Sequence, residues 1–194
     1  MSPAPRVILL DSCAYFRLAR SIHPLLAGIF GPIPPYSLYV LAALDDEYLT
    51  SSRLKNKFEW VNGKEYREDR KGKKYACRGK WAAVAANAFS FLAGHVKEHR
   101  LLLAPEDLKA LAVGFARHIP VVSDDGAVRQ VATAHAIECI GTLDLLKIMV
   151  ECGRIDMAKV AQVLEYWDHE NDLPMGKREL RERYCQLFDG NCPF

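Results

Sequence analysis

Two adjacent carboxylates, Asp124 and Asp125, directly follow a short apolar run of the sequence. That run, residues 119–122, contains the β-branched residues that are typical of a buried strand. Gly126 permits a turn, and apolar residues recur at helical spacing from Val128 onward. Ligands of open α/β sheets bind at this kind of strand end. One acid would serve as a helix cap, whereas two adjacent acids repel each other and favour a bound cation.

Further carboxylates stand at other predicted element boundaries. One acid follows the predicted strand over residues 7–10, where helix capping is the simpler explanation. Three follow the apolar run 38–44, and another lies in the first turn of a helix predicted to begin at Pro105. These acids are Asp11, Asp45, Asp46, Glu47 and Asp107.

A parallel sheet would bring these acids together. Strands and helices alternate with short joints, which predicts right-handed βαβ units and strand ends that converge on one edge. Four acids facing one cleft would repel each other and favour a hard cation, Mg²⁺ or Mn²⁺. A metal-activated water at such a site suits phosphodiester hydrolysis. The sequence has no glycine-rich phosphate loop, so nucleoside triphosphates are less suitable substrates.

Composition limits the class of protein. A chain of 194 residues that is 50% hydrophobic can bury a full core, so one domain with extensions is expected. No apolar run approaches the ~20 residues that span a bilayer, and residues 1–6 do not resemble a secretory signal. The six cysteines are scattered without a C-x-x-C pair, which favours reduced thiols. We therefore expect a soluble, cytoplasmic protein without membrane contact.

Basic residues concentrate in residues 53–80. This segment carries eleven Lys or Arg against four acids, a net charge of +7, and leaves −5 for the rest of the chain. Basic side chains can neutralise phosphates and the interleaved aromatic rings can stack on unpaired bases. A solvated insertion that keeps the protein soluble explains the charges equally well. The cations expected to bind RNA are Lys55, Lys57, Arg70, Lys73 and Lys74.

The helical patterns divide the chain. Residues 81–96 form a strong helical stretch, and the character of the sequence changes after Gly153, where amphipathic helices are predicted over 155–167 and 177–188. We predict a domain over residues 1–152, with the basic insertion at about 53–80, and a C-terminal helical extension over 153–194.

A second kind of site is possible at the end of the 81–96 helix. His95, Glu98 and His99 fit the H-x-x-E-H arrangement of inverted zinc peptidases, in which two His hold zinc beside a Glu base. Such a site needs a third ligand, expected to be a distant carboxylate. Basic residues that interact with the carbonyl end of a helix explain the same pattern.

The chain resembles the PIN-domain ribonucleases, a family that includes the VapC-like toxins. The resemblance rests on VILLDSC (7–13), LDDEY (44–48), PEDLKALA (105–112) and VVSDD (121–125), with IGTLDLL (140–146) similar to the closing strand and helix of some members. It implies a PIN-like, three-layer α/β/α fold with a mostly parallel central sheet, to which the basic helical insertion and the C-terminal helices are added.

The resemblance also implies a function and a site. It implies a metal-dependent endoribonuclease in which Asp11, Glu47, Asp107 and Asp125 bind Mg²⁺ or Mn²⁺. Ser123 would contact a metal ligand or a phosphate oxygen, and Asp124 would assist as a neighbour. Asp45 and Asp46 remain alternatives to Glu47. The implied partners are RNA, an antitoxin protein and a second copy of the chain. A non-catalytic module of the same fold that binds RNA or a protein partner is the alternative.

Overall fold

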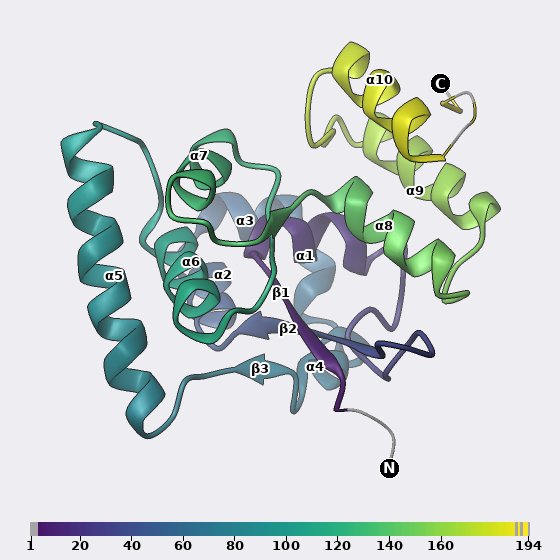
Figure 1. Ribbon diagram of the computed structural model, residues 1–194. Coiled ribbons are helices and arrows are strands. Elements are labelled where there is room, and N and C mark those ends of the chain that lie inside the picture. Colours follow the sequence, from purple (N-terminus) through teal and green to yellow (C-terminus); the bar gives the residue numbers. More distant parts are fainter. Residues whose placement is uncertain (1–3, 189, 191, 194) are drawn as a thin grey trace.

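Five parallel strands form the central sheet of the computed structural model, in the order β3–β2–β1–β4–β5 (Figure 1). The structure describes residues 4–188, 190, 192 and 193. The strands are β1 (Arg6–Leu10), β2 (Tyr36–Leu41), β3 (Lys74–Tyr75), β4 (Val121–Val122) and β5 (Cys139–Ile140). The predicted α/β class with a parallel sheet is confirmed.

Helices alternate with the strands, as the spacing of apolar residues predicts. They are α1 (Ser12–Ala19), α2 (Leu44–Thr50), α3 (Ser52–Lys57), the 3₁₀ turn η1 (Glu59–Asn62), α4 (Lys64–Arg70), α5 (Lys80–Glu98), α6 (Pro105–Arg117), α7 (Gly126–Ala134), α8 (Thr142–Glu151), α9 (Met157–His169) and α10 (Lys177–Phe188). Residues 101–103, between α5 and α6, form no regular element.

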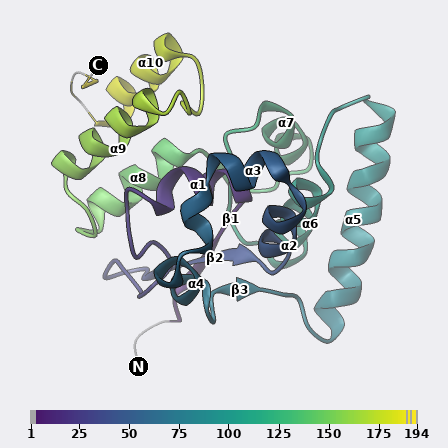
Figure 2. The same ribbon diagram turned by 180° about the vertical axis from the view of Figure 1, so that it is seen from behind.

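Alternate residues of β1 face opposite layers of helices. Ile8 and Leu10 pack in one apolar cluster with residues of α1, α8 and α9, whereas Leu9 packs with residues of α6 on the other face. The strand is buried on both faces, which explains its continuous apolar sequence. Helix α5 packs along α6, at the end of the molecule opposite α9 and α10 (Figures 1 and 2).

The basic insertion is mainly helical and is built into the domain. It forms α3, η1 and α4 and then contributes β3, which pairs with β2 at the sheet edge and was not expected from the sequence. Leu54 and Val61 are buried in the main core, and Phe58 stacks on Phe16 with ring centroids 5.0 Å apart. These apolar and aromatic side chains therefore pack inward, while most of the cations lie at the surface.

Helices α9 and α10 join the same core. Val163, Leu164 and Trp167 of α9 are fully buried, as is Leu180 of α10. The Trp167 indole donates a hydrogen bond to the Arg17 carbonyl oxygen of α1 at 2.9 Å. The C-terminal helices thus cover the layer that contains α1 and α8. Residues 1–3 of the first predicted unit lie outside the described residues. Residues 189, 191 and 194 of the second unit do so as well.

Two further observations concern the whole described chain. Within residues 4–188, 190, 192 and 193, no helix combines the length and the apolar character that crossing a membrane requires. Cys13, Cys77, Cys139, Cys152 and Cys185 are free thiols, as expected.

Because α9 shares the core, Leu164→Ala should destabilise the whole domain. We expect a loss of about 3 kcal/mol in the free energy of unfolding, from the lost apolar burial and the cavity left behind. Urea unfolding followed by fluorescence and by circular dichroism measures it. Leu49→Ala, at a helical position with 56% of the residue exposed, is the control and should change stability by less than about 0.5 kcal/mol. Separate unfolding steps, with only one shifted by Leu164→Ala, would contradict a shared core.

Candidate active site

Strand register brings two predicted site residues side by side. Leu10 of β1 pairs with Val122 of β4, so the residues that follow, Asp11 and Ser123, emerge together at the carboxyl edge of the sheet. The Asp11 amide donates to the Val122 carbonyl oxygen at 3.1 Å, which continues the pairing to this edge. Ser123 is fully buried, and its hydroxyl oxygen accepts a hydrogen bond from the Asp125 amide at 3.3 Å.

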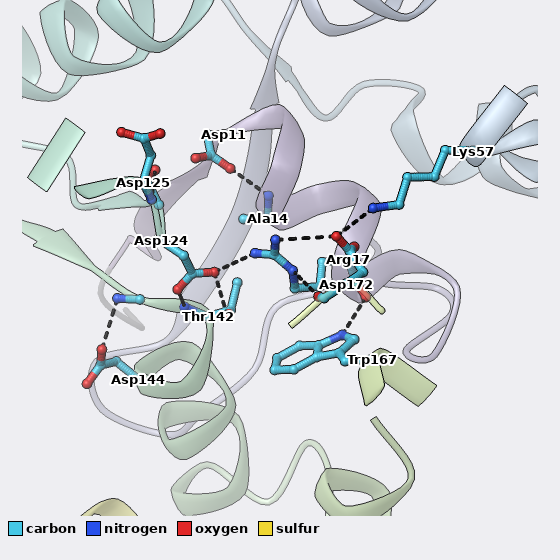
Figure 3. Close-up of polar contacts among 12 residues, drawn as sticks. Asp11, Ala14, Arg17, Lys57, Asp124, Asp125, Thr142, Asp144, Trp167 and Asp172 are labelled. Atoms are coloured by element: carbon cyan, nitrogen blue, oxygen red, sulfur yellow. Dashed lines mark hydrogen bonds and ion pairs between the residues drawn. The ribbon is translucent and has the colours of Figure 1, made fainter. Parts of the chain in front are cut away.

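Asp11 is a buried carboxylate that also caps α1. One of its oxygens accepts a hydrogen bond from the Ala14 amide at 2.6 Å (Figure 3). The pKa of Asp11 is raised to about 7, mainly by burial and also by the charges of Asp107 and Asp124, while hydrogen bonds from Ser123 and Ala14 lower it in part. Asp11 therefore caps α1, the simpler explanation, and also contributes charge to an acidic cluster.

Asp107 and Glu47 complete one side of this cluster. Asp107 lies in the first turn of α6, and its pKa is raised to about 6, mainly by burial and also by the charges of Asp125 and Glu47. Glu47 of α2 accepts a hydrogen bond from the Ser12 hydroxyl, and burial raises its pKa as well. These effects couple acids that are up to 113 positions apart in the sequence, Asp11 and Asp124.

Asp124 and Asp125 have different surroundings. Asp124 accepts hydrogen bonds from the Thr142 amide at 2.9 Å and hydroxyl at 2.7 Å, and forms an ion pair with Arg17 at 2.7 Å (Figure 3). Asp125 is exposed and caps α7, where one carboxylate oxygen accepts from the Ala127 and Val128 amides at 2.8 and 3.0 Å. Its other oxygen accepts no hydrogen bond from any residue that the structure describes. Asp125 is therefore the better placed of the two to bind a ligand.

The acids line two adjoining hollows. A small recess is lined by Asp11, Glu47, Glu106 and Asp107, and a cavity of about 330 Å³ is lined by Asp11, Asp107, Asp124 and Asp125. Asp11 and Asp107 are common to both. We call the two hollows together the acid pocket. The structure thus brings Asp11, Glu47, Asp107, Asp124 and Asp125 to one place, as predicted from the convergence of strand ends.

The donor chemistry of the acid pocket suits a hard divalent cation. In the part of the chain that the structure describes, no three His, Cys, Asp or Glu side chains form a ready-made set of metal ligands. However, the pocket is lined by carboxylate oxygens, the donors that Mg²⁺ and Mn²⁺ prefer. The raised pKa values of Asp11 and Asp107 show that their negative charge is incompletely compensated. Asp11, Glu47, Asp107 and Asp125 are the residues that could hold such an ion.

Arg70 lies inside the protein. Its guanidinium group donates hydrogen bonds to Asp45, to the Tyr15 hydroxyl and to the Val61 carbonyl oxygen, at 3.0, 3.0 and 3.1 Å, and only 2% of the residue is exposed. Asp45 also pairs with Lys74. Arg70 is therefore a structural residue with no surface to offer RNA. Because Asp45 is engaged here, Glu47 is the member of its acidic triplet that lines the acid pocket.

The other predicted RNA-binding cations lie nearer the surface. Lys55 is exposed on α3, and Lys57, also on α3, forms an ion pair with Asp172 at 2.7 Å. Lys73 donates to the Ser37 hydroxyl at 2.9 Å. Lys57 is connected to the acid pocket through Asp172, which contacts Arg17.

Three residues at the acid pocket were missed by the sequence analysis: Ser12, Arg17 and Glu106. Ser12 and Glu106 are neighbours of Asp11 and Asp107, so adjacency is the signal that could have found them. Arg17 gives no such signal, because its partner Asp124 is 107 positions away.

Of the histidines of the zinc alternative, His95 lies on α5 and His99 directly follows that helix. The rings of His95 and His99 are 4.2 Å apart between centroids, and the ring of His135 is 4.5 Å from that of His95. A third histidine thus packs against the pair. Burial lowers the pKa of His135, and so do the charges of the other two histidines.

Comparisons with known proteins were made for the full chain. No protein-family model and no curated protein matches it. The chain is similar to a crystal structure of FitAcB from Neisseria gonorrhoeae, with a TM-score of 0.45 and 14% identity over 70% of this chain and 98% of that one. It is also similar to the crystal structure of VapBC-5, a member of the VapBC family of toxin-antitoxin systems, from Mycobacterium tuberculosis, with a TM-score of 0.43 and 15% identity over 71% of this chain and 99% of that one.

The raised pKa of Asp11 predicts a pH-dependent stability. The folded protein binds this proton more tightly than the unfolded chain, whose Asp has its ordinary pKa of 3.8. The contribution is thus fully present below about pH 4 and is lost as the pH rises through about 7, a change on the order of 3 kcal/mol. Asp11→Asn keeps the helix cap and removes the charge. In EDTA, the Tm of Asp11→Asn minus that of wild type should therefore be about 5 °C larger at pH 8 than at pH 5.

Differential scanning calorimetry of both proteins at pH 5 and pH 8 measures this gain. Asp156→Asn is the control, because Asp156 caps α9 at an exposed position and accepts from the Lys159 amide at 2.8 Å. An equal Tm difference at the two pH values for Asp11→Asn would show that Asp11 bears no buried charge.

Proposed function

We propose that this protein is a metal-dependent endoribonuclease that hydrolyses RNA phosphodiester bonds at the acid pocket. The observation that carries the proposal is the convergence of Asp11, Glu47, Asp107 and Asp125 on two adjoining hollows at the carboxyl edge of a parallel sheet. An acidic cluster of this kind would be costly to maintain without a cation, and a phosphodiester is a substrate that a cation can bring to it.

The proposed roles follow from the position of each side chain. Asp11, Glu47, Asp107 and Asp125 would hold Mg²⁺ or Mn²⁺, which when bound supplies an activated water and neutralises charge on the phosphate. Ser123 is buried between Asp11 and the Asp125 amide, so it fixes the strand ends that carry these acids. Asp124 orients the turn after β4 through its bonds to Thr142. Lys55 and Lys57 of α3 and Lys73 and Lys74 near the sheet edge remain proposed contacts to the RNA backbone.

The family resemblance in the sequence extends the proposal. It supports a PIN-domain ribonuclease that acts as the toxin of a toxin–antitoxin pair, with an antitoxin protein and a second copy of the chain as partners. The acid pocket itself supports the nuclease chemistry and says nothing of these partners. A non-catalytic RNA-binding or partner-binding module of the same fold is the alternative. Such a module would leave RNA uncut whichever divalent metal ion is added.

An RNA-cleavage assay separates these two functions. Wild-type protein should cleave single-stranded RNA with Mg²⁺, lose activity in EDTA and regain it with Mn²⁺. Asp11→Asn should reduce the rate by roughly 100-fold or more, because it removes a proposed metal ligand while keeping the cap of α1.

The control is Asp156→Asn, the same substitution at a helix cap outside the acid pocket, which should cleave at the wild-type rate. Intact RNA with wild-type protein in both metals would exclude the nuclease. Equal cleavage by Asp11→Asn and wild type would place the activity elsewhere on the protein.

A further inference from the structure

One cation stands among the acids of the larger hollow. Arg17, on α1, lines the 330 Å³ cavity together with Asp11, Asp107 and Asp125, and no other Lys or Arg of the described residues contributes to that lining. Its side chain is only 12% exposed. A phosphate that enters this cavity meets several carboxylates, and Arg17 provides the charge that attracts it.

Arg17 is anchored from two directions (Figure 3). Its Nη1 donates to Asp124 at 2.7 Å, and its Nε donates to the Asp172 carbonyl oxygen at 3.0 Å. Its Nη2 lies 3.7 Å from the Asp172 carboxylate, which also pairs with Lys57. Asp172 follows α9, and Trp167 of that helix donates to the Arg17 carbonyl oxygen. The C-terminal segment thus fixes both the backbone and the side chain of Arg17.

The anchoring leaves donors unused. A guanidinium group has five N–H hydrogens in a planar fork. The two hydrogen bonds and the longer ion pair leave hydrogens on both terminal nitrogens that are donated to no residue the structure describes. Nη2 is not among the fully buried, unpartnered side-chain atoms of the described residues, so solvent reaches it, and an anion in the cavity that Arg17 lines can accept its hydrogens.

We propose that Arg17 binds a phosphate group of the RNA substrate in the acid pocket and that Asp172, from the C-terminal segment, positions it. This inference rests on the proposed function for the identity of the substrate. Arg17 touches the substrate, whereas Asp172 acts through Arg17. The C-terminal helices are then part of the substrate site as well as of the core.

RNA binding in EDTA, where no metal-dependent cleavage occurs, tests the role of Arg17. Fluorescence anisotropy of a labelled single-stranded RNA gives the affinity over a series of salt concentrations. Arg17→Gln should weaken binding about tenfold and reduce the salt slope by about one, as expected for the loss of one phosphate contact. Arg178→Gln is the control, because it removes the same charge from an exposed position on α10 that, among the described residues, pairs with Glu182.

Two further variants keep the test independent of folding. Arg17→Gln leaves Asp124 buried without its cation, which can prevent folding. Arg17→Lys preserves the charge but loses the planar fork, and Asp172→Asn preserves the shape but loses the anchoring charge. Arg17→Lys should weaken binding about fivefold, the effect of one hydrogen bond. Asp172→Asn keeps the carbonyl oxygen that accepts from Nε and loses only the 3.7 Å ion pair, so it should weaken binding about twofold. Both variants should have a Tm close to that of wild type. With Mg²⁺, Asp172→Asn should raise KM by the same factor and leave kcat nearly unchanged, whereas a purely structural role would lower Tm and the active fraction without changing KM.

The outcomes distinguish this inference from the proposed function. RNA binding that depends on Arg17, without cleavage in Mg²⁺ or Mn²⁺, would support the inference and exclude the nuclease. Cleavage by wild type, with wild-type RNA affinity for both Arg17→Lys and Asp172→Asn, would overturn the inference and leave the nuclease standing. Absence of both binding and cleavage in the wild type would overturn both.

Discussion

The burial of several carboxylates together at one edge of the sheet is the constraint on which the rest of the structure depends. The pairing of Leu10 with Val122 fixes Asp11 beside Ser123, and α6 and α2 place Asp107 and Glu47 against them. Burial and mutual charge raise the pKa of Asp11 to about 7 and that of Asp107 to about 6. A fold selected for stability alone has no need of such a cluster, so the cost indicates a function in which the charge is used.

The protein compensates part of this charge with its own residues. Arg17 pairs with Asp124, Thr142 donates two hydrogen bonds to the same carboxylate, and Asp172 holds Arg17 from the C-terminal segment. Asp124 is thereby reserved for structure, while Asp125 keeps an oxygen with no donor among the described residues. The adjacent acids Asp124 and Asp125 thus have separate roles. The C-terminal helices are connected to the acid pocket through the same Arg17.

Local patterns predict most of the elements, and parallel topology predicts that the strand ends meet. The helices around Tyr15, Leu111 and Leu164 follow from apolar residues at helical spacing, which are buried in the structure. Strand β3 could not be predicted, because two residues in a charged segment pair only after β2 is in place. The burial of Arg70 could not be predicted either, because its partners include Tyr15, which is 55 positions away in the sequence. The sequence pattern around Arg70 therefore does not indicate that its guanidinium group is buried.

Whether the acids of the pocket share a hard cation is tested most directly by crystals grown or soaked with Mn²⁺ and measured for anomalous scattering. The account predicts an anomalous peak in the acid pocket, at roughly 2.0–2.2 Å from carboxylate oxygens that include those of Asp11 and Asp107. No anomalous peak in the acid pocket of a crystal soaked with saturating Mn²⁺, or a peak at His95 and His99 instead, would contradict the account.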